Sequence, residues 1–221
     1  MKPFLRAAAA ALAVLCAGCT TVTPAVLPDT VAARLAGQNV AIVIQAPAAF
    51  NVMHQDDVPL GPLGLLQGAP RGARMRADEH IADPADDVAT ALADALAGRQ
   101  AAVILSARGS VAHEAPSAAV AAAPPGARYV LTVATLTWGL GRFPMHDAEY
   151  AVAYMARARL VDAQSGAVVA EAACMQPPDG TEVSSKDYDR FVAAHAQLLK
   201  TELGARVDRC VHYLKRDLLG P

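Results

Sequence analysis

The pattern of apolar and polar positions in the first half of the chain predicts a strand, a helix and a second strand. A short β-branched run at 39–45 (NVAIVIQ), bounded by Gly and Pro, is typical of a buried strand. Residues 83–100 place apolar side chains on one helical face, and Asp83 and Pro84 favour the start of a helix there. The apolar run 101–107 (AAVILSA) indicates the next strand.

The second half of the chain predicts three more strands and a closing helix. Alternating apolar positions mark strands at 128–140, 149–163 and 167–174, and the turn DAQSG joins the last two into a hairpin. From about Asp187 to Leu218, apolar residues at steps of three and four form one stripe of a long helix. The expected fold is α/β, with a single mixed β-sheet of about five strands, three of them antiparallel in sequence, and two main helices packed on it.

Two stretches lack a sustained period and are interpreted as loops. Residues 46–83 are rich in Gly and Pro, which predicts a long loop or flap, and residues 108–127 predict a shorter Ala/Pro/Ser loop. The flap carries Leu63, Leu65 and Leu66 and is too apolar to be simply solvated. Packing over the domain, contact with a protein partner and contact with lipid all remain open for it.

Residues 1–18 have the pattern of a bacterial signal peptide. Two early basic residues precede twelve uncharged residues, a run too short to span a bilayer. Small Ala17 and Gly18 stand directly before Cys19, so this stretch resembles the lipobox of bacterial lipoproteins, although Cys16 stands where the lipobox usually has Leu. The resemblance implies cleavage before Cys19 and lipidation of its thiol. An ordinary secretory signal cut near Ala17 or Gly18 is the alternative.

The remaining chain divides into a tether at 19–37 and one domain at 38–221. Thr20 follows the cysteine, and by resemblance to the sorting rule of enteric bacteria it implies an outer-membrane lipoprotein on the periplasmic face. The membrane, reached through the lipid anchor at Cys19, is therefore one expected partner. The formal net charge is only −2 and no basic stripe is present, which argues against a nucleic-acid partner.

Two cysteines, Cys174 and Cys210, remain after Cys16 leaves with the signal peptide and Cys19 is acylated. An even pair in an oxidising compartment favours a disulfide. Cys210 lies in the apolar stripe of the last helix and Cys174 at the end of the last strand, so a helix packed on the sheet brings them within bridging distance. Two free buried thiols and a metal pair are the alternatives.

Candidate catalytic chemistry is sparse in this sequence. MHQDD at 53–57 and ADEH at 77–80 place histidines beside carboxylates, but their spacing matches no established metal motif. The serines lack the G-x-S-x-G context of a nucleophile elbow. His195 and His212 fall within the last helix. We therefore expect no catalytic residue, no metal and no cofactor, and we expect that the protein is not an enzyme.

If the protein has a binding interface, TWGLGRF at 137–143 is the stretch that best fits it, because it holds the single tryptophan with an arginine and a phenylalanine. Tryptophan and arginine are enriched at binding hot spots. For Trp138 itself, closure of the core at the end of a strand is the preferred interpretation. With the leucines of the flap, the candidate interface comprises Trp138, Leu140, Arg142, Phe143, Leu63, Leu65 and Leu66.

The order of elements over roughly 39–174 resembles a group of envelope proteins. The segments DPADDVATALADALAGRQAAVIL, RYVLTVATLTWGLG and ARLVDAQSGAVVAEA carry the resemblance, which is to the amino-terminal domain of TolB, the curli-secretion lipoprotein and the lipoprotein activators of penicillin-binding proteins. The Asp-Pro-Ala helix start and the late cysteine pair also resemble lipoproteins of β-proteobacteria without an assigned activity. The resemblance implies a non-catalytic accessory for protein binding or assembly. The alternatives are a homo-oligomeric structural subunit and a carrier of a small apolar ligand.

Overall fold

The computed structural model describes residues 24–54, 56–57, 62–112, 115–142, 150–174 and 187–220. Of residues 62, 63, 65, 66 and 142 it describes the backbone alone. The predicted signal peptide at 1–18, Cys19 and Phe143 lie outside the described residues, as do the side chains of Leu63, Leu65, Leu66 and Arg142.

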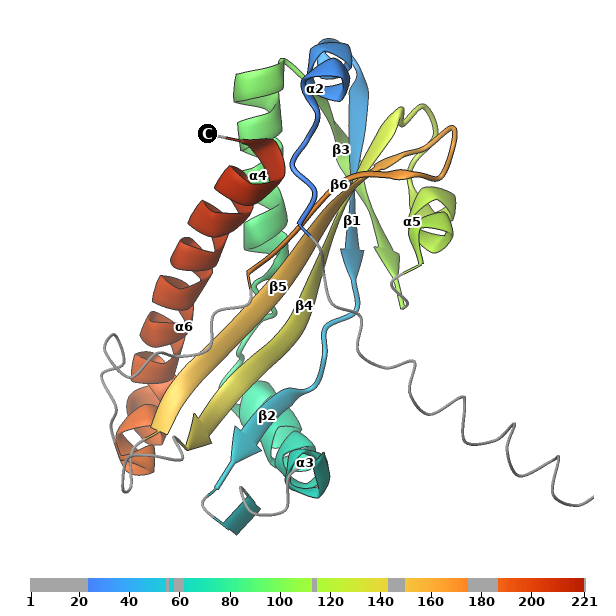
Figure 1. The fold of residues 1–221 in the computed structure, drawn as a ribbon. Helices are drawn as coiled ribbons and strands as arrows, with labels where there is room; N and C mark the ends of the chain where they lie inside the picture. Colours follow the sequence, from blue (N-terminus) through green and yellow to red (C-terminus); the bar gives the residue numbers. More distant parts are fainter. Residues whose placement is uncertain are drawn as a thin grey trace, which may run out of the picture.

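One mixed six-stranded sheet forms the centre of the molecule (Figure 1). Its strands run in the order β3-β1-β4-β5-β6, and β2 pairs with the far part of β4. Strands β1, β3 and β4 are parallel, as are β2 and β4, whereas β4, β5 and β6 are antiparallel. The bounds are β1 Asn39–Gln45, β2 Phe50–Met53, β3 Val103–Val111, β4 Tyr129–Arg142, β5 Tyr150–Asp162 and β6 Val168–Cys174. The prediction of a single mixed α/β sheet is confirmed.

The two main helices expected from the sequence pack on the sheet. Helix α4 (Ala85–Gln100) contacts β1 and β4, and α6 (Tyr188–Leu219) contacts β5 and β6 and also α4. Helix α5 (Pro116–Ala122) packs on the other face, against β3 and β4. The main core lies between the sheet and α4 with α6. Its largest fully buried side chains include Trp138, Phe191, Leu92, Leu96, Leu131, Leu160, Leu199 and Leu214.

A β-bulge in β4 decides which residues of this strand face the core. Before the bulge the odd positions, such as Leu131 and Val133, are buried beneath the helices. The register against β5 shifts between Thr135 and Thr137, so one extra residue turns the even positions inward. Trp138 and Leu140 are therefore core residues, 0% and 1% exposed. Trp138 thus closes the core, as the preferred interpretation of this strand end has it, and Leu140 is buried with it rather than offered to a partner.

The prediction of a long loop over 46–83 is wrong, because this segment contains β2 and the helix α3 (Pro62–Asp78). Three glycines four residues apart form the face of α3 that lies on β2. A Cβ at Gly64, Gly68 or Gly72 would meet the backbone carbonyls of Asp57, Val52 or Phe50 respectively. The glycines that indicated a loop thus serve a close approach of helix to strand.

The first described residues correct the predicted tether over 19–37. Ala25 exchanges two backbone hydrogen bonds with Glu171 of β6, at 2.8 and 2.9 Å. Leu27 is buried, and α2 (Asp29–Leu35) ends on the fully buried Leu35. Residues 25–35 are therefore part of the fold. The loop expected at 108–127 likewise contains the end of β3 and all of α5.

Helix α6 is bent where the sequence predicts one straight helix. Ala193 is extended, and Ala194, His195 and Ala196 adopt the left-handed conformation with φ between 50° and 55°. After the bend, the predicted apolar stripe faces the sheet and α4: Leu199, Leu203, Val207, Cys210, Leu214 and Leu218 are buried. The final part of the helix thus packs as expected. Among the described residues no helix is both long enough and apolar enough to cross a membrane.

Candidate functional site

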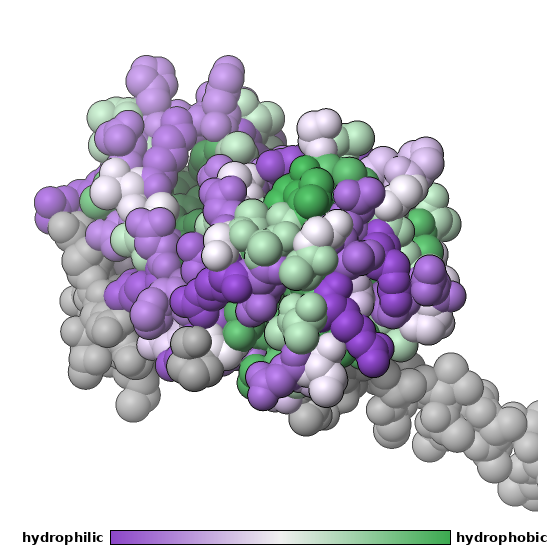
Figure 2. Space-filling view, turned by 90° about the horizontal axis from the view of Figure 1, so that it is seen from above, coloured by the Kyte–Doolittle hydropathy of each residue, from purple (hydrophilic) through white to green (hydrophobic). Residues whose placement is uncertain are grey.

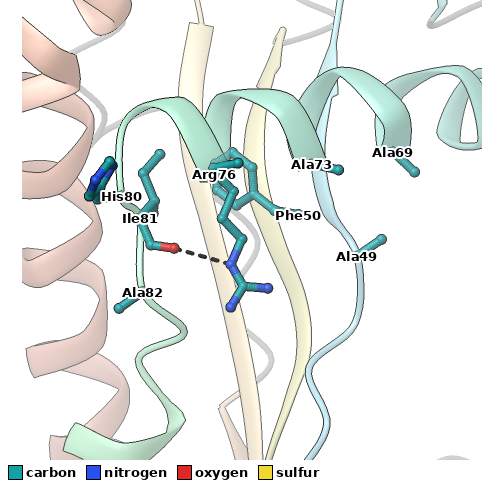
Figure 3. A pocket seen from close by; sticks show the side chains of 9 residues that line it. Ala49, Phe50, Ala69, Ala73, Arg76, His80, Ile81 and Ala82 are labelled. Carbon is teal, nitrogen blue, oxygen red and sulfur yellow. Dashed lines mark hydrogen bonds between the residues drawn. The ribbon is translucent and has the colours of Figure 1, made fainter.

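A pocket of about 410 Å³ lies between α3 and the beginning of β2 (Figure 3). Its volume falls near the lower end of the range typical of small-molecule sites. Most of its wall is made of small or apolar side chains, and it carries one guanidinium. The lining residues are Ala49, Phe50, Ala69, Ala73, Arg76, Ala77, His80, Ile81 and Ala82.

Arg76 is the charged group of this pocket, and two contacts hold it in place. Its guanidinium carbon lies 5.1 Å from the ring centroid of Trp138, a cation–π distance. Its Nε donates a hydrogen bond of 3.1 Å to the carbonyl of Ile81. Figure 3 shows Nε facing that carbonyl and the two terminal nitrogens turned away from it. Among the described residues none bonds those terminal nitrogens.

The backbone around Arg76 explains why its side chain is placed here. Arg76 lies in the last turn of α3, where a cation is favoured by the helix dipole. His80 then takes a left-handed conformation, φ 55°, and the N–H of Ile81 bonds back to the carbonyl of Arg76 at 3.0 Å. The turn that ends α3 therefore folds back over the side chain of Arg76. One role of Arg76 is to close this turn, which its Nε alone accomplishes.

Trp138 provides a rigid support beneath the guanidinium. Its indole N–H donates a hydrogen bond of 2.7 Å to the carbonyl of Ala48. The Phe50 ring packs against it edge-on, with ring centroids 4.9 Å apart and planes at 78°. A fully buried indole held by two neighbours fixes the position of the cation that stacks on it.

The carboxylate of Asp83 acts on Arg76 through space but bonds other groups. Asp83 accepts hydrogen bonds from the Thr135 hydroxyl, at 2.5 Å, and from the backbone N–H of Ala85, at 3.2 Å. Burial raises the pKa of Asp83 above its ordinary value, and the hydroxyl bond and the Arg76 charge oppose this rise. Burial also raises the pKa of Tyr154, whose hydroxyl lies 3.4 Å from that of Thr135. Together, Asp83, Thr135 and Tyr154 support the start of α4.

A second polar cluster lies where β2 ends, and it contains part of the MHQDD motif. Asp57 is almost fully buried, pairs with Arg71 of α3 and accepts the backbone N–H of His54 at 2.8 Å. The His54 ring hydrogen-bonds the Tyr150 hydroxyl at 3.0 Å and stacks edge-on against Tyr188. Because Asp57 is held by these partners, the cluster joins α3, β5 and α6 structurally. Within the described part of the chain, no three or more His, Cys, Asp or Glu side chains gather to hold a metal.

A larger crevice, about 630 Å³, lies beyond the carboxyl ends of the parallel strands β1 and β3. Such a position often holds ligands in open α/β sheets. Its charged group is Arg108, which is bonded to Asp86 at 2.5 Å and to the Thr90 hydroxyl at 2.9 Å. Because both partners come from α4, this guanidinium is already used in joining the helix to the sheet. The pocket beside Arg76 is therefore the better candidate site.

The other predicted site residues fall into two groups. Cys174 and Cys210 form a disulfide in the structure, with Cα atoms 5.3 Å apart, and it joins the end of β6 to α6. The anchor at Cys19 and the interface contacts of Phe143 lie outside the described residues and stay predictions. The same applies to the side chains of Arg142, Leu63, Leu65 and Leu66.

Sequence reasoning missed Arg76 as a site residue, because it lies in the segment interpreted as a loop. Its role depends on Trp138 turning inward at the bulge and on α3 lying against β2. The four-residue spacing of Gly64, Gly68 and Gly72 is the signal in the sequence that could have indicated this helix and its packing face.

No family model matches the chain, and no curated protein matches its sequence. Solved structures that resemble it include a PelC dodecamer from Paraburkholderia phytofirmans, at 17% identity and a TM-score of 0.38, covering 90% of this chain and 96% of that chain. The hypothetical protein CT253 from Chlamydia trachomatis is 7% identical, with a TM-score of 0.36 and coverage of 80% and 96%. Lipoprotein GNA1162 from Neisseria meningitidis is 11% identical, with a TM-score of 0.24 and coverage of 76% and 99%. Likenesses this distant carry no argument about what this chain does.

Proposed function

We propose that this protein is a non-catalytic lipoprotein of the outer membrane that faces the periplasm and acts as a protein-binding or assembly accessory. The lipobox-like stretch ending at Cys19 supports the anchor, and Thr20 supports the outer membrane by resemblance to the sorting rule. The disulfide between Cys174 and Cys210 fits an oxidising compartment.

The observation that carries the proposal is the short distance along the chain between the anchor and the fold. Only five residues, 20–24, separate Cys19 from Ala25, which is hydrogen-bonded to Glu171 of β6. A chain spans at most about 3.5 Å per residue, so the acylated cysteine is held within about 21 Å of that bond. An anchored domain of this kind stays next to the bilayer.

The end of the molecule that carries α3 and β2 is then the part able to reach a partner beyond the membrane. Thr132 of β4 pairs with Arg159 of β5, which in turn pairs with Glu171, so these residues lie level with the attachment point. From Thr132 the strand continues for ten residues to Arg142, a rise of about 33 Å. We assign partner binding to this distal end.

The surface near the attachment is mixed in character. Figure 2 looks down on the end that carries α2 and shows polar side chains interspersed with small apolar areas. The exposed large apolar side chains of the described residues, Val26, Val103 and Val168, belong to three different segments of the chain. Three exposed valines do not by themselves indicate a binding surface. The end that carries α2 is therefore assigned only the role of facing the membrane.

Replacing the anchor cysteine tests the first half of the proposal. Cys19→Ser should move the protein from the outer-membrane fraction to the soluble periplasmic fraction and abolish labelling by an alkyne fatty acid. Cys16→Ser is the matched control and should change neither result, because that residue leaves with the signal peptide. Equal labelling of the wild type and Cys19→Ser would reject the anchor.

Site-specific photo-crosslinking in cells tests the second half. A photoreactive residue at Gln67, exposed on α3, should capture one dominant envelope protein, whereas one at Val26, beside the attachment, should not capture it. Adducts at Gln67 that contain only copies of this chain would replace the accessory role with that of a homo-oligomeric subunit.

A further inference from the structure

The pocket beside Arg76 combines one fixed cation with an otherwise small and apolar wall. Besides Arg76, the pocket is lined by five alanines, Phe50, Ile81 and His80. A guanidinium presents its donors in a planar fork that matches the two oxygens of a carboxylate. Here the Nε end of the fork is used by the Ile81 carbonyl, and the edge formed by the two terminal nitrogens remains.

We propose that this pocket binds a monocarboxylate that carries a compact apolar body, with the carboxylate on the terminal nitrogens of Arg76 and the apolar body against Phe50 and the alanines. A free small acid and the carboxyl terminus of a polypeptide share this chemistry. The inference goes beyond the accessory role and does not depend on the lipid anchor, because the pocket is built from α3, β2 and the turn after α3.

Charge matching favours a single carboxylate over other ligands. Arg76 is the one arginine or lysine among the residues that line the pocket, so a doubly charged phosphate would be left with an unmatched charge. A neutral apolar ligand would instead cover the terminal nitrogens of Arg76 without offering them an acceptor. A carboxylate satisfies both nitrogens and carries one charge, equal and opposite to that of Arg76. Asp83, which acts on Arg76 through space, is itself held by the Thr135 hydroxyl and the Ala85 N–H.

Pre-organisation makes the site suited to binding without rearrangement. The cation–π contact with Trp138 and the bond to Ile81 already restrict the rotamers of Arg76, so less side-chain entropy is lost when a ligand binds. Trp138 is in turn held by Ala48 and Phe50. The same stacking means that a ligand on Arg76 alters the environment of the indole.

That coupling supplies a reporter, because Trp138 is the single tryptophan of the chain. With [15N-indole]-tryptophan, the full chain in nonionic detergent should give one indole N–H resonance. N-acetyl-valine should shift this resonance saturably, with a Kd of about millimolar for so small a ligand. N-acetyl-valinamide, which has the same apolar body without the charge, should shift it at least tenfold more weakly. N-acetyl-Ala-Ala-Val with a free carboxylate distinguishes the two sources: tighter binding than the single residue indicates a polypeptide terminus, and equal or weaker binding indicates a free acid.

Two variants and a control separate the charge from the cavity. Arg76→Gln should weaken N-acetyl-valine binding about 10- to 100-fold, the usual effect of losing a charge-assisted bond. Ala69→Leu should weaken it by filling the pocket while Arg76 remains. Arg74→Gln is the matched control on the same helix, because Arg74 is exposed and does not line the pocket. The affinity of this variant for N-acetyl-valine should stay within twofold of the wild-type value.

The proposal is overturned if the acid and the amide shift the resonance equally, or if neither shifts it at 20-fold the expected Kd. It is also overturned if Arg74→Gln weakens binding as much as Arg76→Gln, since that outcome indicates general attraction to a basic helix. The comparison of acid with amide uses the unchanged protein, so it decides the question even where Arg76→Gln fails to fold.

Discussion

Breaking the bond between Cys174 and Cys210 should lower stability more than any surface change, because the bond fixes the last helix to an edge strand. Cys174 ends β6 and Cys210 lies fully buried in the middle of α6. The bond closes a loop with a sequence separation of 36. In the chain-entropy account, closing a loop of that length raises the free energy of the unfolded chain by roughly 4 kcal/mol. Measured disulfides typically add about 2–4 kcal/mol to the free energy of unfolding.

For a domain of this size each kcal/mol changes Tm by roughly 2–4 °C, so loss of the bond should lower Tm by about 5–15 °C. The cleanest comparison uses the same chain with and without a thiol reductant, because reduction leaves every side-chain volume unchanged. Urea titrations in both states should differ in midpoint and supply the free energy of unfolding directly. A Cys174→Ala/Cys210→Ala variant should match the reduced protein and should no longer respond to reductant.

Two results would refute this reasoning. Alkylation of the native protein without reductant that labels both Cys174 and Cys210 would show that the bond is absent. Midpoints that agree within error for the oxidised and reduced protein would show that the packing of α6 alone holds it on the sheet.

Three further predictions concern the backbone and one buried carboxylate. His195→Gly should stabilise the protein by about 1 kcal/mol in urea titrations, because the φ of His195 is 55° and its side chain is 94% exposed. In a straight helix the same change would destabilise the protein by a similar amount. Gly72→Ala should lower the free energy of unfolding by about 1–3 kcal/mol, because the new Cβ would meet the Phe50 carbonyl. Gly98→Ala in α4 is the control: its Cβ meets nothing, so it should stabilise slightly. Equal effects of the two changes would contradict the packing of α3 on β2. Burial raises the folded-state pKa of Asp83. The contribution of its protonation to the free energy of unfolding is therefore fully present below about pH 3.8, the pKa in the unfolded chain, and is lost as the pH rises through the raised pKa of the folded state. Asp83→Asn should therefore gain stability relative to the wild type between acidic and neutral pH, and a difference that does not change with pH would contradict the buried environment.

The sequence alone predicted the elements whose periodicity is local. Strand β1 is a continuous apolar run, β5 and β6 are two apolar runs joined by a clear turn, and α4 has an apolar face and begins where Asp83 accepts the Ala85 N–H. In each case the spacing of side chains within one element reflects the face that it buries. The late cysteines could be paired for the same reason, because one ends a strand and the other lies in a helical stripe.

Helix α3 escaped prediction because its local signals conflict with its tertiary role. Gly64, Gly68, Gly72 and Pro70 lower helix propensity, and so they indicated a loop. In the fold the glycines remove the side chains that would keep the helix away from β2. A contact between two segments overrides the propensity of one of them, and the sequence of α3 by itself does not contain that contact.

The candidate site was decided by the tertiary structure for the same reason. The sequence determined that Trp138 lies near the end of a strand, but the bulge at Thr135–Thr137 determined that it turns inward. Only then does Arg76, 62 positions earlier in the chain, find an aromatic face to stack on and a pocket beside it. The local spacing of residues determines strands and helices, whereas a shift of register by one residue and a close approach of two backbones determine where a charge and a cavity meet.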